Sequence, residues 1–177
     1  NGPSAIFRAT APAPGGPWTV GEEPVLLPGA EGEWDSGAVF GAYVIRSGDG
    51  YVMYYDGKPG VQMPGAIGMA TSEDGIVWTK RGEPVLSVES GEAWDSSGMS
   101  MPVVQRVGQR WVMLYTSLQP SGERALGLAW SEDGMRWSRY AGNPIFTPSD
   151  IPQALFLHAA HVFCEDRCWL ILEIVDQ

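Results

Sequence analysis

Positive charge is scarce in this chain, and its scarcity excludes several kinds of partner. Lys and Arg together number 11 against 21 Asp and Glu, which gives a formal net charge of −10. Nucleic acids and anionic membrane surfaces are bound by clusters of basic side chains, so neither is expected as a ligand. No apolar run approaches the roughly 20 residues of a membrane span. Long segments of helical period are also missing, which argues against a helical fold.

Cysteine and histidine are nearly absent, with two of each. Cys164 and Cys168 flank a short segment that is typical of a hairpin turn. Opposed positions on two strands can bring a pair of cysteines within disulfide reach. The sequence leaves a disulfide and two free thiols equally open, and a disulfide would suit a secreted or periplasmic protein. Two cysteines at this spacing do not make a metal site by themselves.

What the chain does have is an internal repeat. Residues 24–86 align with residues 84–146 at an offset of 60 residues. The matched segments are Pro24-Val25-Leu26 with Pro84-Val85-Leu86, Trp34-Asp35-Ser36 with Trp94-Asp95-Ser96, Tyr51–Tyr55 with Trp111–Tyr115, and Ser72-x-Asp74-Gly75 with Ser131-x-Asp133-Gly134. A fixed period of this size indicates an array of one structural unit. The end of an earlier unit lies near Trp18, and residues 144–177 open a third copy.

Each unit is predicted to contain four short strands. Residues 42–46 and 51–55 are rich in β-formers and flank a Ser-Gly-Asp-Gly turn, which predicts a β-hairpin. Third strands are expected over 66–71 and 126–130, and each Asp-Gly turn leads into a short fourth strand. Four antiparallel strands per repeat are typical of a propeller blade. The predicted fold class is therefore all-β, made of β-propeller blades.

The predicted domain organisation has two parts. Residues 1–17 are rich in Ala, Pro and Gly and are expected to form a flexible N-terminal arm. Residues 18–177 form a partial β-propeller, with repeats at about 24–83, 84–143 and 144–177.

The repeat resembles the five-bladed β-propeller glycosidase superfamily. The resemblance is carried by Gly-x-Ala-x-Ser-x-Asp-Gly-x-x-Trp, preceded by a Met-Tyr-Tyr strand and followed by Pro-Val-Leu, and it covers residues 18–175. The superfamily includes glycoside hydrolase families 43, 32, 68, 117 and 130, among them arabinanases, invertases and levansucrases. The resemblance implies an incomplete propeller of about three blades. It also implies a glycoside hydrolase-like protein that acts on or binds oligosaccharides through the propeller channel.

Glycosidic bond cleavage needs two carboxylates that flank the bond. In this superfamily the first carboxylate lies in an Asp-Pro pair just before the first hydrophobic strand. The corresponding positions here are Gly41-Ala42, Met101-Pro102 and Ala159-Ala160, and none is acidic. The alternatives are therefore a non-catalytic carbohydrate-binding or assembly module, or an inactive fragment of a larger glycosidase. No cofactor is expected, although calcium sits in the channel of some relatives.

Asp35 and Asp95 are the acidic candidates that remain in the first two units. Their Trp-Asp-Ser strings resemble the nucleophile segment of the levansucrase-like family. If they act, Asp35 is the base or nucleophile and Asp95 the acid or an orienting group. Repetition at one blade position equally suits a structural carboxylate that ties down a loop. The neighbouring Trp34 and Trp94 lie in loops and are candidates for sugar contact.

Three polar residues interrupt the repeat in the third unit. His158 and His161 stand where the repeat predicts small or apolar residues, so they are candidates to line the channel and bind substrate. Buried histidines with satisfied hydrogen bonds are the alternative. Glu173 aligns with tyrosines of the first two units, and a buried carboxylate there would have a raised pKa suited to a general acid. A solvated strand end is the alternative for this residue.

An arc of about three blades leaves unpaired strand edges and apolar faces, which proteins usually cover. Two copies that exchange terminal strands would cover them. A homodimer or higher oligomer that completes the propeller is therefore predicted, with a piece of a larger enzyme as the alternative. The expected small-molecule partner is a carbohydrate.

Overall fold

The computed structural model describes residues 4–60, 63–88, 94–150, 154–164 and 167–176, without the side chains of 154–163 and 175–176. Within these ranges every strand pairing is antiparallel, and the only helical element is a 3-10 turn over Pro148–Asp150. No helix in the described ranges is long and apolar enough to cross a membrane. The all-β class predicted from the sequence is confirmed.

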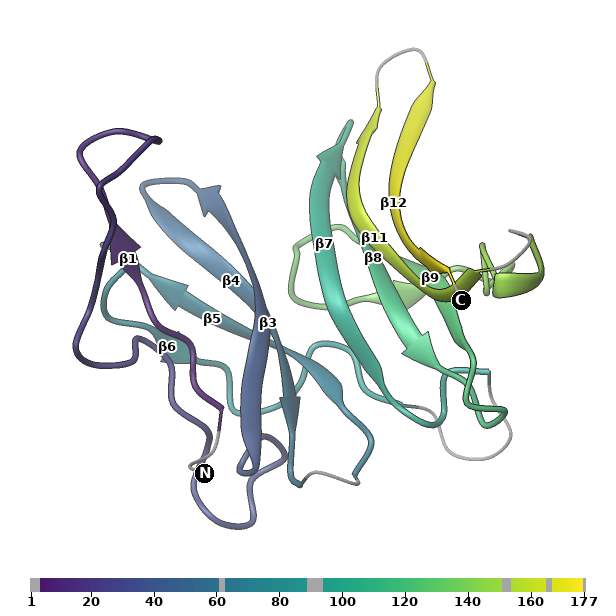
Figure 1. Cartoon of the computed structure of the whole chain (residues 1–177), viewed down its shortest axis with the longest axis horizontal. Coiled ribbons are helices and arrows are strands. Elements are labelled where there is room, and N and C mark those ends of the chain that lie inside the picture. Colours follow the sequence, from purple (N-terminus) through teal and green to yellow (C-terminus); the bar gives the residue numbers. More distant parts are fainter. Residues whose placement is uncertain (1–3, 61–62, 89–93, 151–153, 165–166, 177) are drawn as a thin grey trace.

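Two complete blades form the centre of the molecule (Figure 1). The first contains β3 (Ala38–Ser47), β4 (Gly50–Lys58), β5 (Ala66–Ser72) and β6 (Thr79–Lys80), and the second contains β7 (Met99–Val107), β8 (Arg110–Leu118), β9 (Arg124–Ser131) and β10 (Ser138–Arg139). In both blades the spatial order of the strands follows the chain. This meander of four strands is the arrangement that the repeat predicted.

Two smaller sheets lie at opposite ends of the arc (Figure 1). The N-terminal sheet pairs β1 (Ala9–Thr10) with β2 (Thr19–Val20), and the C-terminal sheet pairs β11 (Ala154–Cys164) with β12 (Cys168–Asp176). β11 and β12 follow the second blade and form a hairpin, as the first two strands of each complete blade do. They are therefore the inner half of a third blade.

The N-terminal sheet is the outer half of a blade. Ile6 bridges Leu26 in the way that Ile67 bridges Leu86 and Leu126 bridges Phe146. The register continues into the short strands, because Thr10 pairs with Thr19 as Thr71 pairs with Thr79. Residues 6–10 thus occupy the place of a third strand and β2 the place of a fourth strand.

Residues 4–10, the described first part of the flexible arm predicted over residues 1–17, form a strand segment held against its neighbours. The Ser4 carbonyl accepts a hydrogen bond from the Val39 amide at 3.0 Å. Ile6 packs against a buried cluster that includes Leu26, Val39 and Tyr55. Apolar burial and backbone hydrogen bonds hold the segment against the first blade, which the Ala/Pro/Gly-rich composition did not reveal.

The blades pack face to face, with the inner strand of each blade lying against the blade before it. β7 contacts β3, β4 and β5, and β11 contacts β7, β8 and β9. The second strand of each blade is covered on both faces, so residues 53–57 and 113–117 are buried without interruption. Tyr54 ties the two blades together, because its hydroxyl donates to the Gly134 carbonyl at 2.8 Å and its ring meets Trp137 edge-on.

The Ser-x-Asp-Gly turns are rigid backbone supports. Asp74 Oδ1 accepts hydrogen bonds from the amides of Ile76 and Val77 at 2.8 and 2.9 Å. Asp133 does the same in the second blade, and the Arg136 and Met135 amides lower the pKa of its carboxyl to about 2. Hydrogen bonds that favour the charged form explain this shift.

Candidate functional site

Asp56 is a buried carboxyl group inside the first blade. It lies on β4, between Phe40 on β3 and Ile67 on β5, and its exposed fraction is 0%. The corresponding residue of the second blade is Thr116, which occupies the same place in the same register. Asp56 is therefore a departure from the repeat at a buried position, where a carboxylate is costly.

Two backbone bulges enclose this carboxyl group. The Met101 amide donates to Asp56 Oδ1 at 2.9 Å and to Oδ2 at 3.1 Å. On the other side a side chain at Gly41 would collide with Asp56 Oδ2. Gly41 and Met101 both have the left-handed backbone conformation, with φ of 58° and 54°. This conformation is unfavourable for methionine, and such strain is commonly found at functional sites.

Gly41 and Met101 also begin the dipeptides where the superfamily resemblance placed the missing Asp-Pro carboxylate. The space next to them is filled by Asp56, which arrives from the adjacent strand of the first blade. Neither dipeptide carries the expected Asp-Pro carboxyl, and Asp56 is a different carboxyl, on the second strand, that lies next to both dipeptides. Asp56 is not among the candidates that the sequence indicates. Its mismatch with Thr116 in the repeat was the available signal.

The surroundings of Asp56 favour its protonated form. Burial raises the pKa of the carboxyl to about 8, and the hydrogen bond from the Met101 amide opposes that rise. Desolvation disfavours the charged form of any acid, so the carboxyl group keeps its proton near neutral pH. A carboxylic acid that is protonated at working pH has the property required of a general acid.

A pocket of about 410 Å³ opens at the same end of the blades. Phe40 and Met101, the two residues that flank Asp56, both line it, so the carboxyl lies directly behind the pocket wall. Lys58 and Arg124 also line it and provide two cationic side chains. The pocket therefore combines apolar surface, cations and an adjacent protonated acid, a combination typical of small-molecule sites.

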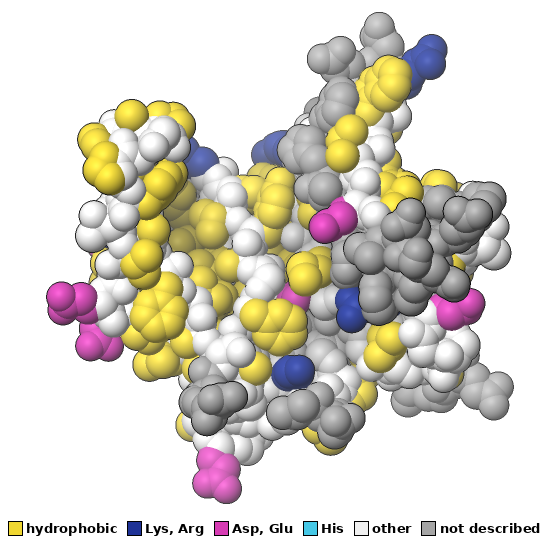
Figure 2. Space-filling model, in the orientation of Figure 1, with side chains coloured by type: hydrophobic (Ala, Val, Ile, Leu, Met, Phe, Trp, Pro, Cys, Tyr) yellow, Lys and Arg dark blue, Asp and Glu magenta, His cyan; other side chains and the backbone are white. Residues whose placement is uncertain are grey.

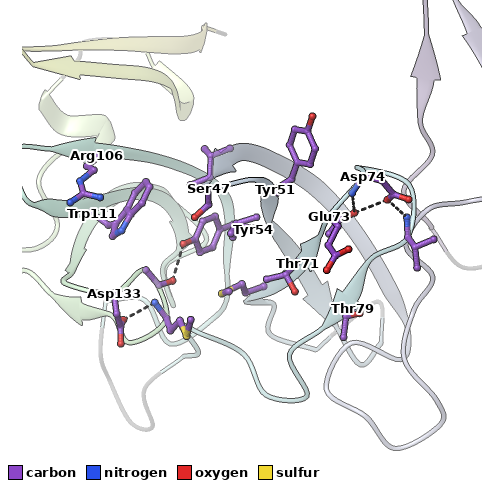
Figure 3. Close-up of a pocket in the computed structure, with 18 residues that line it drawn as sticks. Ser47, Tyr51, Tyr54, Thr71, Glu73, Asp74, Thr79, Arg106, Trp111 and Asp133 are labelled. Atoms are coloured by element: carbon purple, nitrogen blue, oxygen red, sulfur yellow. Dashed lines mark hydrogen bonds between the residues drawn. The ribbon is translucent and has the colours of Figure 1, made fainter.

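A second, larger groove of about 660 Å³ lies at the hairpin end of the blades (Figure 3). Its floor includes Tyr54 and Met69, and Tyr51, Arg106 and Trp111 are among the residues that line it. The Ser-x-Asp-Gly turns border it, and their aspartates are engaged with backbone amides. This groove contains no group with the properties of Asp56.

Asp35 and Asp95 occupy equivalent buried places, each with a cation from the outermost strand. Asp35 pairs with Lys80 at 2.6 Å and accepts a hydrogen bond from the Tyr55 hydroxyl at 3.0 Å. Asp95 pairs with Arg139 at 2.7 Å. Both carboxylates are about 1% exposed, and each pairs through Oδ2 with a cation and a tyrosine hydroxyl, although Asp95 Oδ1 is buried without a hydrogen-bond partner among the described residues. This duplicated geometry favours the structural alternative, and a catalytic role for either residue stays a prediction.

Trp34 and Trp94 are half-buried and pack within their own blades. Trp34 stacks on Tyr55 with ring centroids 5.8 Å apart, and its Nε1 donates to the Gly82 carbonyl at 3.0 Å. Trp94 lies over Tyr115 at 5.9 Å. Each indole reaches a strand glycine that leaves room for it. Packing accounts for both residues, and their contact with sugar stays a prediction.

The candidates of the third unit lie on β11 and β12. His158 stands opposite Glu173 in the backbone register and His161 opposite Ile171, but the histidine side chains lie outside the described residues. Glu173 is exposed, which fits the solvated alternative. Cys164 and Cys168 form a disulfide across the same hairpin, so the sequence alternative of free thiols is wrong.

Metal binding finds no support among the described residues, where no group of three or more His, Cys, Asp or Glu could hold an ion. The calcium that the resemblance allows stays a prediction.

Comparison with known proteins agrees with the β-propeller architecture described above. No family model matches the chain. The chain is 32% identical over 130 residues to a β-1,2-mannobiose phosphorylase of Thermoanaerobacter sp. (strain X514), which covers 65% of this chain and 42% of the relative. Among solved structures, a family 117 glycoside hydrolase of Zobellia galactanivorans superposes with a TM-score of 0.68 at 14% identity, covering 88% of this chain and 48% of that one.

A structure from the GH130 family of mannoside phosphorylases, a family that contains glycoside hydrolases targeting β-1,2 mannosidic linkages in Candida mannan, gives a TM-score of 0.64 at 18% identity. The match covers 94% of this chain and 51% of that one. The class defined by the blades is that of a β-propeller. The chain is a partial propeller with the fold of the five-bladed glycosidase superfamily, as the sequence predicted. It spans less than half the length of the curated relatives that it matches.

Proposed function

We propose that this chain forms part of an oligosaccharide-cleaving site in which Asp56 is the general acid. The observation that carries the proposal is a fully buried carboxyl, with its pKa raised to about 8, behind the wall of a pocket. The names of the relatives point to mannose-containing oligosaccharides as the substrate class. Because Asp56 is fully buried behind the pocket wall, its proton reaches the glycosidic oxygen through an intervening water or sugar hydroxyl as the bond to the anomeric carbon breaks.

The acceptor of the sugar is proposed to be inorganic phosphate. Hydrolysis needs a second carboxylate to activate water, whereas phosphorolysis uses the phosphate oxygen itself as the nucleophile. The pocket beside Asp56 presents Lys58 and Arg124, and cationic side chains suit a phosphate. The products are a glycosyl phosphate and a shortened sugar whose new hydroxyl carries the proton from Asp56. Hydrolysis is the second candidate, supported by the glycoside hydrolases among the structural neighbours.

The first prediction concerns turnover. The chain is incubated with β-1,2-mannobiose, with and without inorganic phosphate, and the release of mannose 1-phosphate and free mannose is measured. Asp56→Asn should lower the rate by about 100-fold or more, because an amide cannot supply the proton. Asp49→Asn, in the exposed turn between β3 and β4, is the matched control and should leave the rate unchanged.

Each outcome of that assay has a separate meaning. An Asp56→Asn variant with full activity would refute the general-acid assignment. Mannose release at the same rate without phosphate would replace phosphorolysis with hydrolysis and leave Asp56 as the acid. Saturable sugar binding without turnover would support the alternative of a carbohydrate-binding module.

We also propose that the chain acts as a homodimer or higher oligomer that completes the propeller. Support comes from the half-blades at the two ends of the arc, which leave exposed strand edges (Figure 1). The alternative of a piece of a larger glycosidase is supported by the partial coverage of the relatives.

A further inference from the structure

The larger groove lies between the two complete blades, at the end of the strands opposite to Asp56. Gly50, at the start of β4, lines this groove, and Lys58, at the end of β4, lines the pocket beside Asp56. At about 3.3 Å per residue along the strand, the two sites are roughly 25 Å apart. Figure 2 shows a hollow at this end of the blades, bordered by hydrophobic and basic side chains. A small ligand in the groove is therefore out of reach of Asp56.

The groove is open because the first blade departs from the repeat at this place. Thr71 on β5 lines the groove and stands opposite Val52 on β4. In the second blade Trp130 stands opposite Val112, so an indole occupies the place that corresponds to Thr71. The small side chain of Thr71 thus leaves free, on the face of the first blade, a space that a large aromatic ring fills on the second blade.

A second departure from the repeat widens the same space. In the second blade the guanidinium of Arg110 lies 4.7 Å from the centroid of the Trp130 ring. The matching residue of the first blade is Gly50, because each is the first residue of the second strand in its blade. A flat polar group stacked on an aromatic ring therefore occupies, in the second blade, the place that is open in the first.

The second blade supplies an aromatic wall across from this open face. Trp111 on β8 packs against the core between the blades and also lines the groove. Arg106 on β7 lines the groove as well, with its guanidinium 5.6 Å from the centroid of the Trp111 ring. Figure 3 shows these two side chains on one side of the groove and Thr71 and Thr79 on the other. An occupant would thus lie between an indole and a pair of hydroxyl groups.

The polar side chains of the groove suit a neutral ligand that is rich in hydroxyl groups. Thr71 and Thr79 are cross-strand partners on β5 and β6, and both are exposed. A hydroxyl group both donates and accepts hydrogen bonds, and the exposed carboxylate of Glu73 adds an acceptor at the rim. Asp74 and Asp133 also line the groove, so its border is acidic and disfavours a phosphorylated or otherwise anionic ligand.

We propose that this groove is a second oligosaccharide-binding site, in which a sugar ring lies between the indole of Trp111 and the hydroxyl groups of Thr71 and Thr79. A pyranose ring has a flat apolar face and a rim of hydroxyl groups, which matches an aromatic wall that faces polar side chains. The volume of about 660 Å³ is in the range of small-molecule sites. The choice of a mannose-containing chain rests on the proposed function, whereas the site itself does not depend on Asp56.

The indole N–H resonances of an isotope-labelled chain test the groove directly by NMR. β-1,2-Mannotetraose is titrated into the Asp56→Asn chain without phosphate, so that the sugar persists. The Trp111 resonance, identified by its absence from the Trp111→Tyr variant, should shift as the sugar binds. The Trp130 resonance comes from the matching place of the second blade, where Arg110 already covers the ring, so it is the internal control and should stay unchanged.

A variant that fills the groove provides a second readout. Thr71→Trp places an indole where the second blade has Trp130, and it should weaken sugar binding in the groove at least tenfold. Thr71 is exposed, so folding is not at risk. Ser138→Trp is the matched control, because Ser138 is the exposed partner of Trp130 on the second blade and lies outside the groove. In a chain that keeps Asp56, Thr71→Trp should leave the cleavage of β-1,2-mannobiose unchanged.

The two readouts separate the second site from the proposed chemistry. A Trp111 shift that Thr71→Trp abolishes and Ser138→Trp preserves would support the groove, even in a chain that cleaves no sugar. Sugar binding that leaves the Trp111 resonance unchanged and persists in Thr71→Trp would place the sugar elsewhere and overturn the second site alone. A groove that binds a proline-rich peptide, the other common occupant of aromatic-lined grooves, but no sugar would overturn it as well.

Discussion

Asp56 keeps its proton because it is fully buried in the first blade, where burial disfavours the charged carboxylate. The folded-state pKa of about 8 stands well above the ordinary value of 3.8. Between these values the folded chain binds more protons than the unfolded chain, so the free energy of unfolding falls as the pH rises. The group therefore destabilises the fold increasingly from about pH 4 to pH 8, and the loss is complete above the folded pKa.

The fall of the free energy of unfolding with rising pH leads to a prediction for thermal unfolding between pH 5 and pH 9. The wild-type chain should lose stability with rising pH, by at most about 1.4 kcal/mol per pH unit from this group. Asp56→Asn, which does not ionise, should show a flatter profile and exceed the wild type at the alkaline end. Parallel profiles for the two chains would show that the carboxyl group does not titrate in this window.

At the scale of single residues, the repeat predicted correctly the residues that recur in both units. It did not predict a functional residue that occurs in one unit alone. It placed the paired tyrosines, tryptophans and Asp-Gly turns correctly, because each recurs for the same packing reason. Asp56 was missed because the predicted second strand ended at Tyr55, whereas β4 continues to Lys58. A buried acid beyond the last apolar residue has no local signature in the sequence.

At the scale of elements, the Asp35–Lys80 and Asp95–Arg139 pairs fasten a loop to the outermost strand of each blade. A two-residue fourth strand buries little apolar area, so the ion pair holds it in place. The partners stand 45 and 44 residues apart. Which cation meets each aspartate depends on the register of three intervening strands. The sequence therefore indicated that each aspartate could hold its loop in place, but it did not identify Lys80 or Arg139 as the partner.

We predict that Asp35→Ala destabilises the fold by about 2–3 kcal/mol, measured by chemical denaturation. Breaking a buried ion pair from one side costs about 3–5 kcal/mol, and the figure is reduced here because the Lys80 side chain is 23% exposed. Glu132→Ala is the control, since it breaks the exposed Arg110–Glu132 pair at 2.9 Å and should cost less than about 1 kcal/mol. Equal effects would contradict a structural role for Asp35.

The N-terminal segment shows how an element escapes sequence analysis. Its Pro-rich and Gly-rich composition predicted an arm, yet Ile6 aligns with Ile67 at an offset of 61 rather than 60 residues. The third strands of the complete blades also depart from 60, since Ile67 aligns with Leu126 at an offset of 59 residues, but they share the Gly-x-Ala-x-Ser string that residues 7–11 lack. The two complete blades were therefore predicted correctly, and the N-terminal strand was missed.

At the scale of the whole molecule, the chain is an arc of two complete blades with a two-stranded sheet at each end. Dimerisation that binds only folded chains stabilises them by mass action, so the melting temperature depends on concentration. We predict that the melting temperature of the wild type rises by a few degrees from micromolar to hundred-micromolar chain. A concentration-independent wild type would indicate that each chain is stable alone.

The arc has a direction, because each complete blade begins with an inner strand and ends with an outer one. The two ends of the arc therefore present different strands, so whatever continues the sheet at one end meets a different surface from whatever continues it at the other.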